Sequence, residues 1–313
     1  MKASEFSAEK FLEVSQEALS QSAVHIRKAM LGYVDAPEYK KKEDKSILTP
    51  TDVISQNIAR PIILEGLPDI RLVQEESDKD LGNLESEVYG YFDPLDGSRP
   101  FLMGGVTSTN ILGLWDSKNK EILAVSTMEP MSGRFWHSTK GKGTYLSVYD
   151  YTTGEFDEGR QLHVSDQEFS GSRVFIDATE GFARKVRGTG EKRQVFYNQG
   201  RRELTNLLQA NGANEISFFS NGSHYAVVSL GRPLTAVCIT SAIGGPYDIT
   251  GMLHVIESGG VAQCYGIREE GGKRGIYEMG QNIKDADLAV AANTQKNLDM
   301  VAGILNKAAN YRS

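Results

Sequence analysis

One segment restricts the fold of this chain more than any other: an apolar run at residues 88–92 leads directly into Asp93-Pro94-Leu95-Asp96-Gly97-Ser98. The apolar run predicts a buried strand, and the proline and glycine that follow predict a tight turn. Asp93 and Asp96 then share one rim of a sheet, where two carboxylates repel each other unless a cation lies between them. An all-oxygen ligand set without His or Cys favours a hard ion such as Mg²⁺ over Zn²⁺.

A second acidic residue is predicted at the start of a helix. Thr49-Pro50 is typical of a helix N-terminus and places Asp52 in the first turn, in a capping arrangement with Thr49. The helix dipole favours the ionised form of a carboxylate there. Pro61 is expected to kink or end this helix.

Two further acidic clusters lie at element ends. Glu75-Glu76 follows a predicted strand, and Asp248 opens a predicted helix. If Gly97 and Ser98 open a helix as well, their backbone amides form a phosphate site beside a metal.

The order of the predicted elements indicates two parts. Residues 1–155 predict an α+β part that carries most of the acidic clusters, and residues 156–313 predict an α/β part that carries Asp248. A polar stretch at about 150–170 marks the boundary. The expected strands are 70–73, 88–92, 109–115, 122–128, 134–136, 144–146, 173–177, 215–219, 234–239 and 288–292. The expected helices, besides the one after Thr49, are 7–31, 201–209, 223–230, 248–258 and 295–309.

Composition excludes several classes of protein. With 34 Lys and Arg against 41 Asp and Glu, the net charge of −7 argues against nucleic acid as a partner. The 2 cysteines exclude a disulfide framework and an all-Cys zinc site. Neither the N-terminus nor the apolar stretch at 225–245, which Arg232-Pro233 interrupts, fits a signal peptide or a membrane span. We therefore expect a cytoplasmic protein without a membrane partner.

The acidic pattern resembles that of the inositol monophosphatase superfamily, which are Mg²⁺-dependent, lithium-sensitive phosphomonoesterases. The likeness runs in order over about residues 8–310. Besides the acidic clusters it includes Lys42, Asp44, Ser46 and Thr49 before Asp52, Gly251 and Glu257-Ser258-Gly259-Gly260 after Tyr247-Asp248, and a last strand with Asn293 at 288–293. The resemblance implies a layered α-β-α-β-α fold and hydrolysis of a small phosphate monoester.

The resemblance also implies a metal set. Glu75, Asp93 and the Leu95 carbonyl would hold a first Mg²⁺. Asp93, Asp96 and Asp248 would hold a second, with Asp93 bridging the two, and a weaker third ion would lean on Glu75.

Two residues match the family's pair that orients and deprotonates the attacking water. They are Asp52 and Ser98, the latter at a position that the family often fills with Thr. Because the hydroxyl is kept, the resemblance implies that the pair is functional.

The implied substrate contacts fall in two groups. Asp96, Gly97 and Ser98 match the phosphate-facing turn. The residues that match the rest of the substrate site are Asn221, Ser223, His224 and Ser241.

The branch of the family stays open. Leu95 and Arg99-x-Phe101 resemble bisphosphate nucleotidases and histidinol phosphatases, and Pro246-Tyr247-Asp248 resembles the histidinol branch. Ser241, however, stands where many members place a Glu, and Asn221 stands where the histidinol branch often has Asp. Without these acids a substrate ammonium group loses its partners.

The expected substrate is therefore an inositol, polyol or sugar phosphate, with histidinol phosphate or a 3′(2′),5′-bisphosphate nucleotide as alternatives. A hypothesis of another class is a non-catalytic metal- or phosphometabolite-binding protein on the same fold. The set Asp52, Glu75 and Ser98 argues against it, because a binding module needs no water-activating residues. The resemblance also implies a homodimer.

Overall fold

The computed structural model describes residues 5–34, 39–41, 47–176, 183–185, 192–194, 198–217, 220–241, 245–270 and 273–309. The family-like residues Lys42, Asp44 and Ser46 lie outside these ranges, as do the expected strand ends at 177 and 218–219. In the described part of the chain, no helix is long and apolar enough to cross a membrane.

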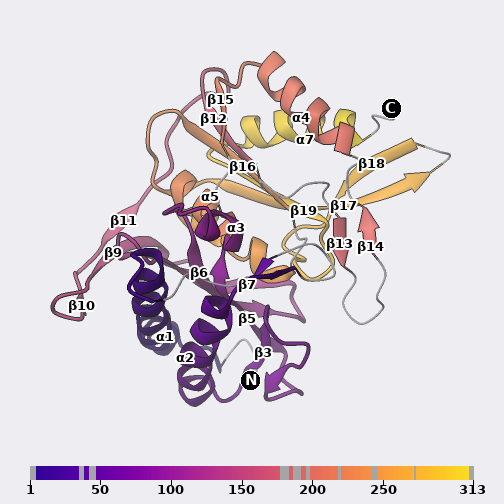
Figure 1. Ribbon diagram of the computed structural model, residues 1–313. Coiled ribbons are helices and arrows are strands. Elements are labelled where there is room, and N and C mark those ends of the chain that lie inside the picture. The colour runs from indigo at the N-terminus through magenta and orange to yellow at the C-terminus, as the bar shows by residue number, and fades with distance from the viewer. Residues whose placement is uncertain are drawn as a thin grey trace.

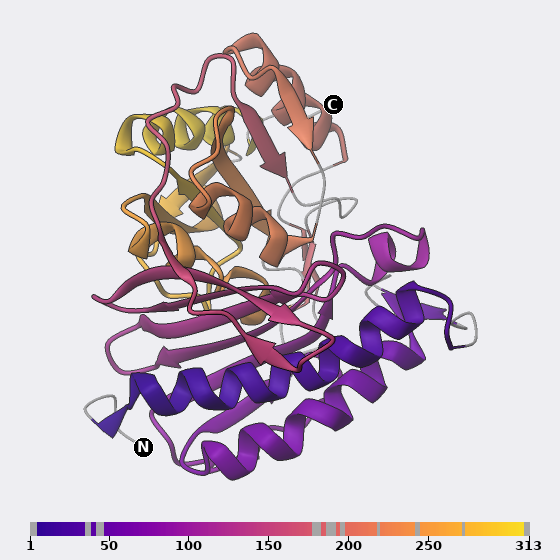
Figure 2. The same cartoon turned by 90° about the vertical axis from the view of Figure 1, so that its left-hand side faces the viewer.

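Two sheets and three layers of helices form an α-β-α-β-α stack (Figures 1 and 2). Helices α1 and α2 cover the outer face of the first sheet, α5 and α6 lie between the sheets, and α4 and α7 cover the outer face of the second. The described helices are α1 (Ala8–Met30), α2 (Pro50–Gly66), α3 (Ser98–Leu102), α4 (Asn198–Ala210), α5 (Asn221–Ser229), α6 (Met252–Glu257), α7 (Gln295–Ala309) and a 3-10 helix at Pro246–Ile249. This stack confirms the mixed α/β fold expected from the sequence.

The first sheet has the strand order β10-β9-β8-β7-β6-β5-β3-β4, and β11 also pairs with β9. Its pairs are antiparallel except for β3 with β5. Its strands are β3 (Arg71–Gln74), β4 (Leu81–Gly82), β5 (Val88–Asp96), β6 (Thr109–Asp116), β7 (Glu121–Glu129), β8 (Arg134–Thr139), β9 (Gly143–Asp150), β10 (Glu155–Phe156) and β11 (Arg160–Leu162). The first sheet thus continues to Leu162 before the chain crosses to the second.

The second sheet has the order β15-β12-β16-β19-β17-β18. Strand β12 is parallel to β15 and β16, and the other pairs are antiparallel. Its strands are β12 (Arg173–Ile176), β15 (Glu215–Ser217), β16 (Thr235–Ser241), β17 (Val261–Glu270), β18 (Lys273–Glu278) and β19 (Leu288–Ala292). Two short hairpins, β1 (Lys40–Lys41) with β2 (Ile47–Leu48) and β13 (Ala183–Lys185) with β14 (Lys192–Gln194), stand apart from both sheets.

Sequence periodicity predicted the long elements well, and α7 and β19 match their expected bounds. One alternative for Pro61 was wrong and one pair of strands was missed. Pro61 does not end α2, which continues to Gly66; it lies on the exposed face, where the carbonyl that loses its amide partner is open to solvent. Strands β17 and β18 were missed because their charged, glycine-containing sequence shows no clear alternation.

Candidate active site

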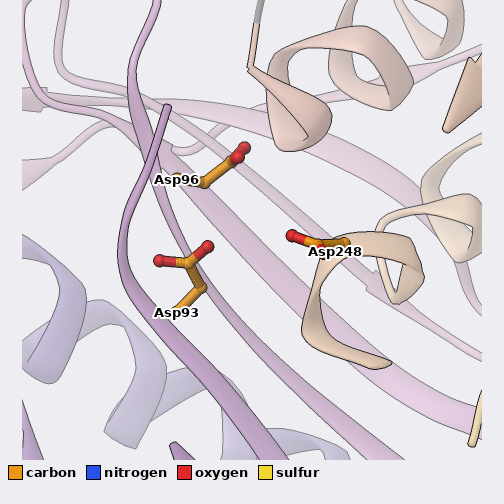
Figure 3. A group of neighbouring side chains, drawn as sticks. All are labelled: Asp93, Asp96 and Asp248. Carbon is orange, nitrogen blue, oxygen red and sulfur yellow. The ribbon is translucent and has the colours of Figure 1, made fainter. Parts of the chain in front are cut away.

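A β-bulge in β5 brings the two acids of the opening motif to the same side of the sheet. The pairing of β5 with β6 joins Asp93 to Ile111 and Asp96 to Thr109, with a register shift between these two pairs. Residues three apart on a regular strand face opposite sides. Because a bulge adds one residue, Asp93 and Asp96 point the same way (Figure 3).

A third carboxylate arrives from the other half of the molecule. Asp248 lies in the 3-10 helix Pro246–Ile249 and faces Asp93 and Asp96 from the opposite side (Figure 3). Its carboxylate accepts a hydrogen bond of 3.1 Å from the backbone N–H of Gly245, which fixes its direction. One oxygen atom from each of the three carboxylates lies within 4.8 Å of the others. All three residues are buried, with exposed fractions of 2%, 5% and 7% for Asp93, Asp96 and Asp248.

Charge crowding in this cluster disfavours full ionisation. Burial raises the pKa of Asp93 well above its ordinary value, and the nearby carboxylates of Glu75, Asp96 and Asp248 raise it further. Burial also raises the pKa of Asp96 to about 6, although hydrogen bonds from its neighbours oppose the shift. A divalent cation between these groups would remove the mutual repulsion.

Beside the cluster, Asp52 and Ser98 form a hydrogen-bonded pair. The Ser98 hydroxyl donates to Oδ1 of Asp52 at 2.8 Å and also lies 3.2 Å from the Leu95 carbonyl. Asp52 is fully buried in the first turn of α2, where the backbone N–H of Thr49 donates to its Oδ2 at 2.8 Å, as the capping pattern predicts. Burial is the main cause that raises the pKa of Asp52 to about 6.

Glu75 adjoins both groups. It follows β3, its carboxyl shares a hydrogen bond with Asp93, and its charge also raises the pKa of Asp52. The Glu75 backbone N–H donates to the Phe92 carbonyl of β5 at 3.1 Å. The structure therefore brings together Asp52, Glu75, Asp93, Asp96, Ser98 and Asp248.

Sequence reasoning missed Gln56, whose side chain holds the turn at Glu75-Glu76 after β3. Gln56 lies one helical turn after Asp52, and its side-chain amide pairs with the Glu76 backbone: Nε2 donates to the carbonyl and Oε1 accepts from the N–H, each at 3.2 Å. The spacing of four residues after Asp52 puts Gln56 on the same helix face, and this signal was readable in the sequence.

The other expected substrate contacts lie on the turn after β5, on α5 and on β16. Gly97 has a left-handed backbone with φ of 87°, and a Cβ there would lie 2.8 Å from Ser220 Cβ, so both conformation and space require glycine. Asn221 and Ser223 begin α5. His224 is fully buried in the same helix with its ring 5.7 Å from that of Phe175, and Ser241 is the buried last residue of β16.

Together these features define a mixed α/β protein with a buried, all-oxygen acidic site between its two sheets. The chain belongs to the inositol monophosphatase family, whose sequence profile matches residues 5–232. A curated relative, the fructose-1,6-bisphosphatase/inositol-1-monophosphatase of Aquifex aeolicus, is 25% identical over 159 residues. That match spans about half of each protein, 51% of this chain and 54% of the relative.

Solved structures share the fold over nearly the whole chain. The extragenic suppressor protein SuhB from Bartonella henselae matches with a TM-score of 0.71 at 17% identity, over 95% of this chain and 98% of that one. An IMPase from Thermotoga maritima matches with a TM-score of 0.69 at 18% identity, over 95% and 97%. At such low identity these likenesses show the fold.

Proposed function

We propose that this protein is a Mg²⁺-dependent phosphomonoesterase that hydrolyses a small phosphate monoester by attack of water. The observation that carries the proposal is the meeting of Asp93, Asp96 and Asp248, whose oxygen atoms lie within 4.8 Å of one another in a buried site. Its family membership agrees with this reaction class.

The residues present fit a hard divalent cation. The donors are carboxylate oxygens. By the family resemblance, Glu75, Asp93 and the Leu95 carbonyl would hold a first Mg²⁺, and Asp93, Asp96 and Asp248 would hold a second. Glu75 would also contribute to a weaker third site. Buried acids with raised pKa values are the expected metal-free state of such a site, because their repulsion lacks a counter-charge. Bound Mg²⁺ would neutralise charge on the phosphate and lower the pKa of the attacking water.

The chain's own residues prepare the water. Asp52 accepts the Ser98 hydrogen bond, so the Ser98 oxygen is oriented with its lone pairs toward a further donor, which we assign to the nucleophilic water. Asp52, with its pKa near 6, is ionised at neutral pH and close enough to that range to serve as a general base through Ser98. We assign Glu75, whose charge acts on Asp52, as the third catalytic residue beside Asp52 and Ser98.

The phosphate would lie against the turn of Asp96, Gly97 and Ser98, whose left-handed backbone at Gly97 requires glycine. For the alcohol part we propose an inositol, polyol or sugar phosphate, in agreement with the name of the Aquifex aeolicus relative. Asn221, Ser223, His224 and Ser241 remain the proposed contacts to this part. Histidinol phosphate and a bisphosphate nucleotide are the alternatives. A homodimer is proposed from the family resemblance alone.

The Asp52–Ser98 hydrogen bond favours an enzyme over a non-catalytic metal-binding protein, since metal binding alone does not need it. The test is phosphate release from a panel of monoesters, with Mg²⁺ and with excess EDTA. We expect turnover with Mg²⁺, little with the larger Ca²⁺, none with EDTA, and inhibition by Li⁺. Full activity in EDTA would refute the metal assignment, and Mg²⁺ binding without turnover of any monoester would favour the binding protein.

A further inference from the structure

Thr109 lies directly against one of the proposed metal ligands. It is the first residue of β6, it is fully buried, and its backbone pairs with that of Asp96 across the β-bulge. Its hydroxyl Oγ1 donates to Oδ2 of Asp96 at 3.0 Å. We propose that Thr109 is a positioning residue that holds the Asp96 carboxylate in the orientation needed to bind Mg²⁺, an inference that rests on the function proposed above.

The same carboxylate is held by the helix between the two sheets. The first backbone amides of α5 donate to it, Gly222 to Oδ2 at 2.6 Å and Asn221 to Oδ1 at 3.2 Å. Of these three hydrogen bonds, Asp96 Oδ2 accepts two and Oδ1 accepts one. Since each carboxylate oxygen offers about two lone-pair sites, Oδ1 retains capacity for a cation while Oδ2 is saturated.

The N-cap of α5, Ser220, lies next to Thr109. Ser220 Oγ lies 3.3 Å from Thr109 Oγ1, and the hydroxyls of Ser220 and Ser223 both donate to the Thr107 carbonyl, at 2.7 and 2.5 Å. A threonine hydroxyl has one hydrogen, and the carboxylate is the stronger acceptor, so Thr109 directs that hydrogen to Asp96 rather than to Ser220.

Glycine at position 222 makes this close approach feasible. A Cβ there would lie 2.6 Å from Thr109 Oγ1 and 2.6 Å from Ile111 Cδ1. The first turn of α5, Thr109 and Asp96 therefore form one packed unit drawn from both halves of the molecule. Residues that orient a metal ligand through hydrogen bonds typically change metal affinity or activity by about 10–100-fold when removed.

The experiment compares Thr109→Val with Thr109→Ser. Valine keeps the shape of threonine and removes the hydroxyl, whereas serine keeps the hydroxyl. The matched control is Thr144→Val on β9, because Thr144 is equally buried in the same sheet but its hydroxyl donates to the His254 carbonyl at 2.7 Å, and β7 and β8 separate it from β6. The readouts are Mg²⁺ affinity by titration calorimetry, the rise in Tm on adding Mg²⁺, and kcat and KM at saturating Mg²⁺.

We expect Thr109→Val to weaken Mg²⁺ binding by about 10-fold or more and to reduce the Mg²⁺-induced rise in Tm, while Thr109→Ser and Thr144→Val stay close to the wild type. Wild-type affinity in folded Thr109→Val, or equal weakening in Thr144→Val, would overturn the positioning role. If Thr109→Val does not fold, Thr109→Ala is measured against Thr109→Ser under the same criterion. Absence of Mg²⁺ binding in the wild type would instead refute the proposed function itself.

Discussion

The Ser98 hydroxyl donates a hydrogen bond of 2.8 Å to the Asp52 carboxylate beside the acidic cluster. Ser98 is the first residue of α3, and Asp52 lies in the first turn of α2. Asp52 is simultaneously held by the backbone N–H of Thr49, so its orientation does not depend on a bound substrate. The pair is therefore preorganised in the folded chain.

Ser98→Ala tests this pair directly. Because Ser98 is assigned to the water, its loss should lower kcat by about 10²–10⁴-fold, the range of a general-base contribution. KM and the Mg²⁺ requirement should change little, and Ser98→Thr should retain most activity. The measurement is steady-state kinetics at several Mg²⁺ concentrations.

The double variant of Ser98→Ala with Asp52→Asn is the control for a shared role. Residues that act as a unit are non-additive, so the double change should cost little beyond either single one. Losses that multiply independently would mean that the two residues do not activate the water together.

Asp93→Asn should abolish turnover without unfolding the protein. The change removes a charge from the centre of the cluster, and we expect a loss of more than about 100-fold in kcat. In EDTA the Tm should be unchanged or higher, because repulsion with Glu75, Asp96 and Asp248 is relieved. Near-wild-type activity would indicate that the cluster has a structural role only.

The stability of the metal-free protein should fall as pH rises from about 4 to about 6. The pKa of Asp52 and that of Asp96 are each raised from 3.8 to about 6 by burial, so in this window the folded protein binds protons that the unfolded chain has released. Unfolding then becomes easier with rising pH, and the contribution of these groups is lost above their folded pKa values. Thermal denaturation in EDTA across this range measures the effect.

Two comparisons test whether these carboxylates cause the pH dependence of the metal-free stability. In Asp52→Asn the pH dependence should be shallower, since one titrating group is gone. With Mg²⁺ present the fall should be smaller or reversed, because the cation binds the ionised carboxylates. A metal-free Tm that rises steadily through the same window in the wild type would contradict the assignment.

Gln56→Leu should make the turn at Glu75-Glu76 less stable and the position of Glu75 less well defined. The change removes the two 3.2 Å hydrogen bonds that Gln56 makes to the half-buried Glu76 backbone, at a cost of about 0.5–1.5 kcal/mol each. We expect a lower Tm and a loss of about 10-fold or more in kcat/KM. Asn57→Leu is the control, since Asn57 is the exposed next residue on α2. Equal losses in kcat/KM for both variants would show that Gln56 has no particular role at the site.

Much of the local structure follows from short-range rules that a sequence displays. The cap at Thr49, the apolar strand before Asp93 and the periodic face of α7 depend on neighbouring residues, so their positions could be predicted from the sequence. Pro61 shows where such rules fail. Whether a proline ends a helix depends on what surrounds its lost hydrogen bond, and at Pro61 that is solvent.

The sequence by itself determined which chemical groups the site contains: carboxylates, a hydroxyl and glycines, with the family motif that orders them. Only the tertiary structure decided how they meet. The β-bulge that aligns Asp93 with Asp96, the approach of Asp248 from the other sheet and the hold of Thr109 and α5 on Asp96 all depend on pairing between distant segments. Such pairing follows from packing both halves around a common interior, and no local sequence pattern encodes the distance between side chains so far apart in the chain.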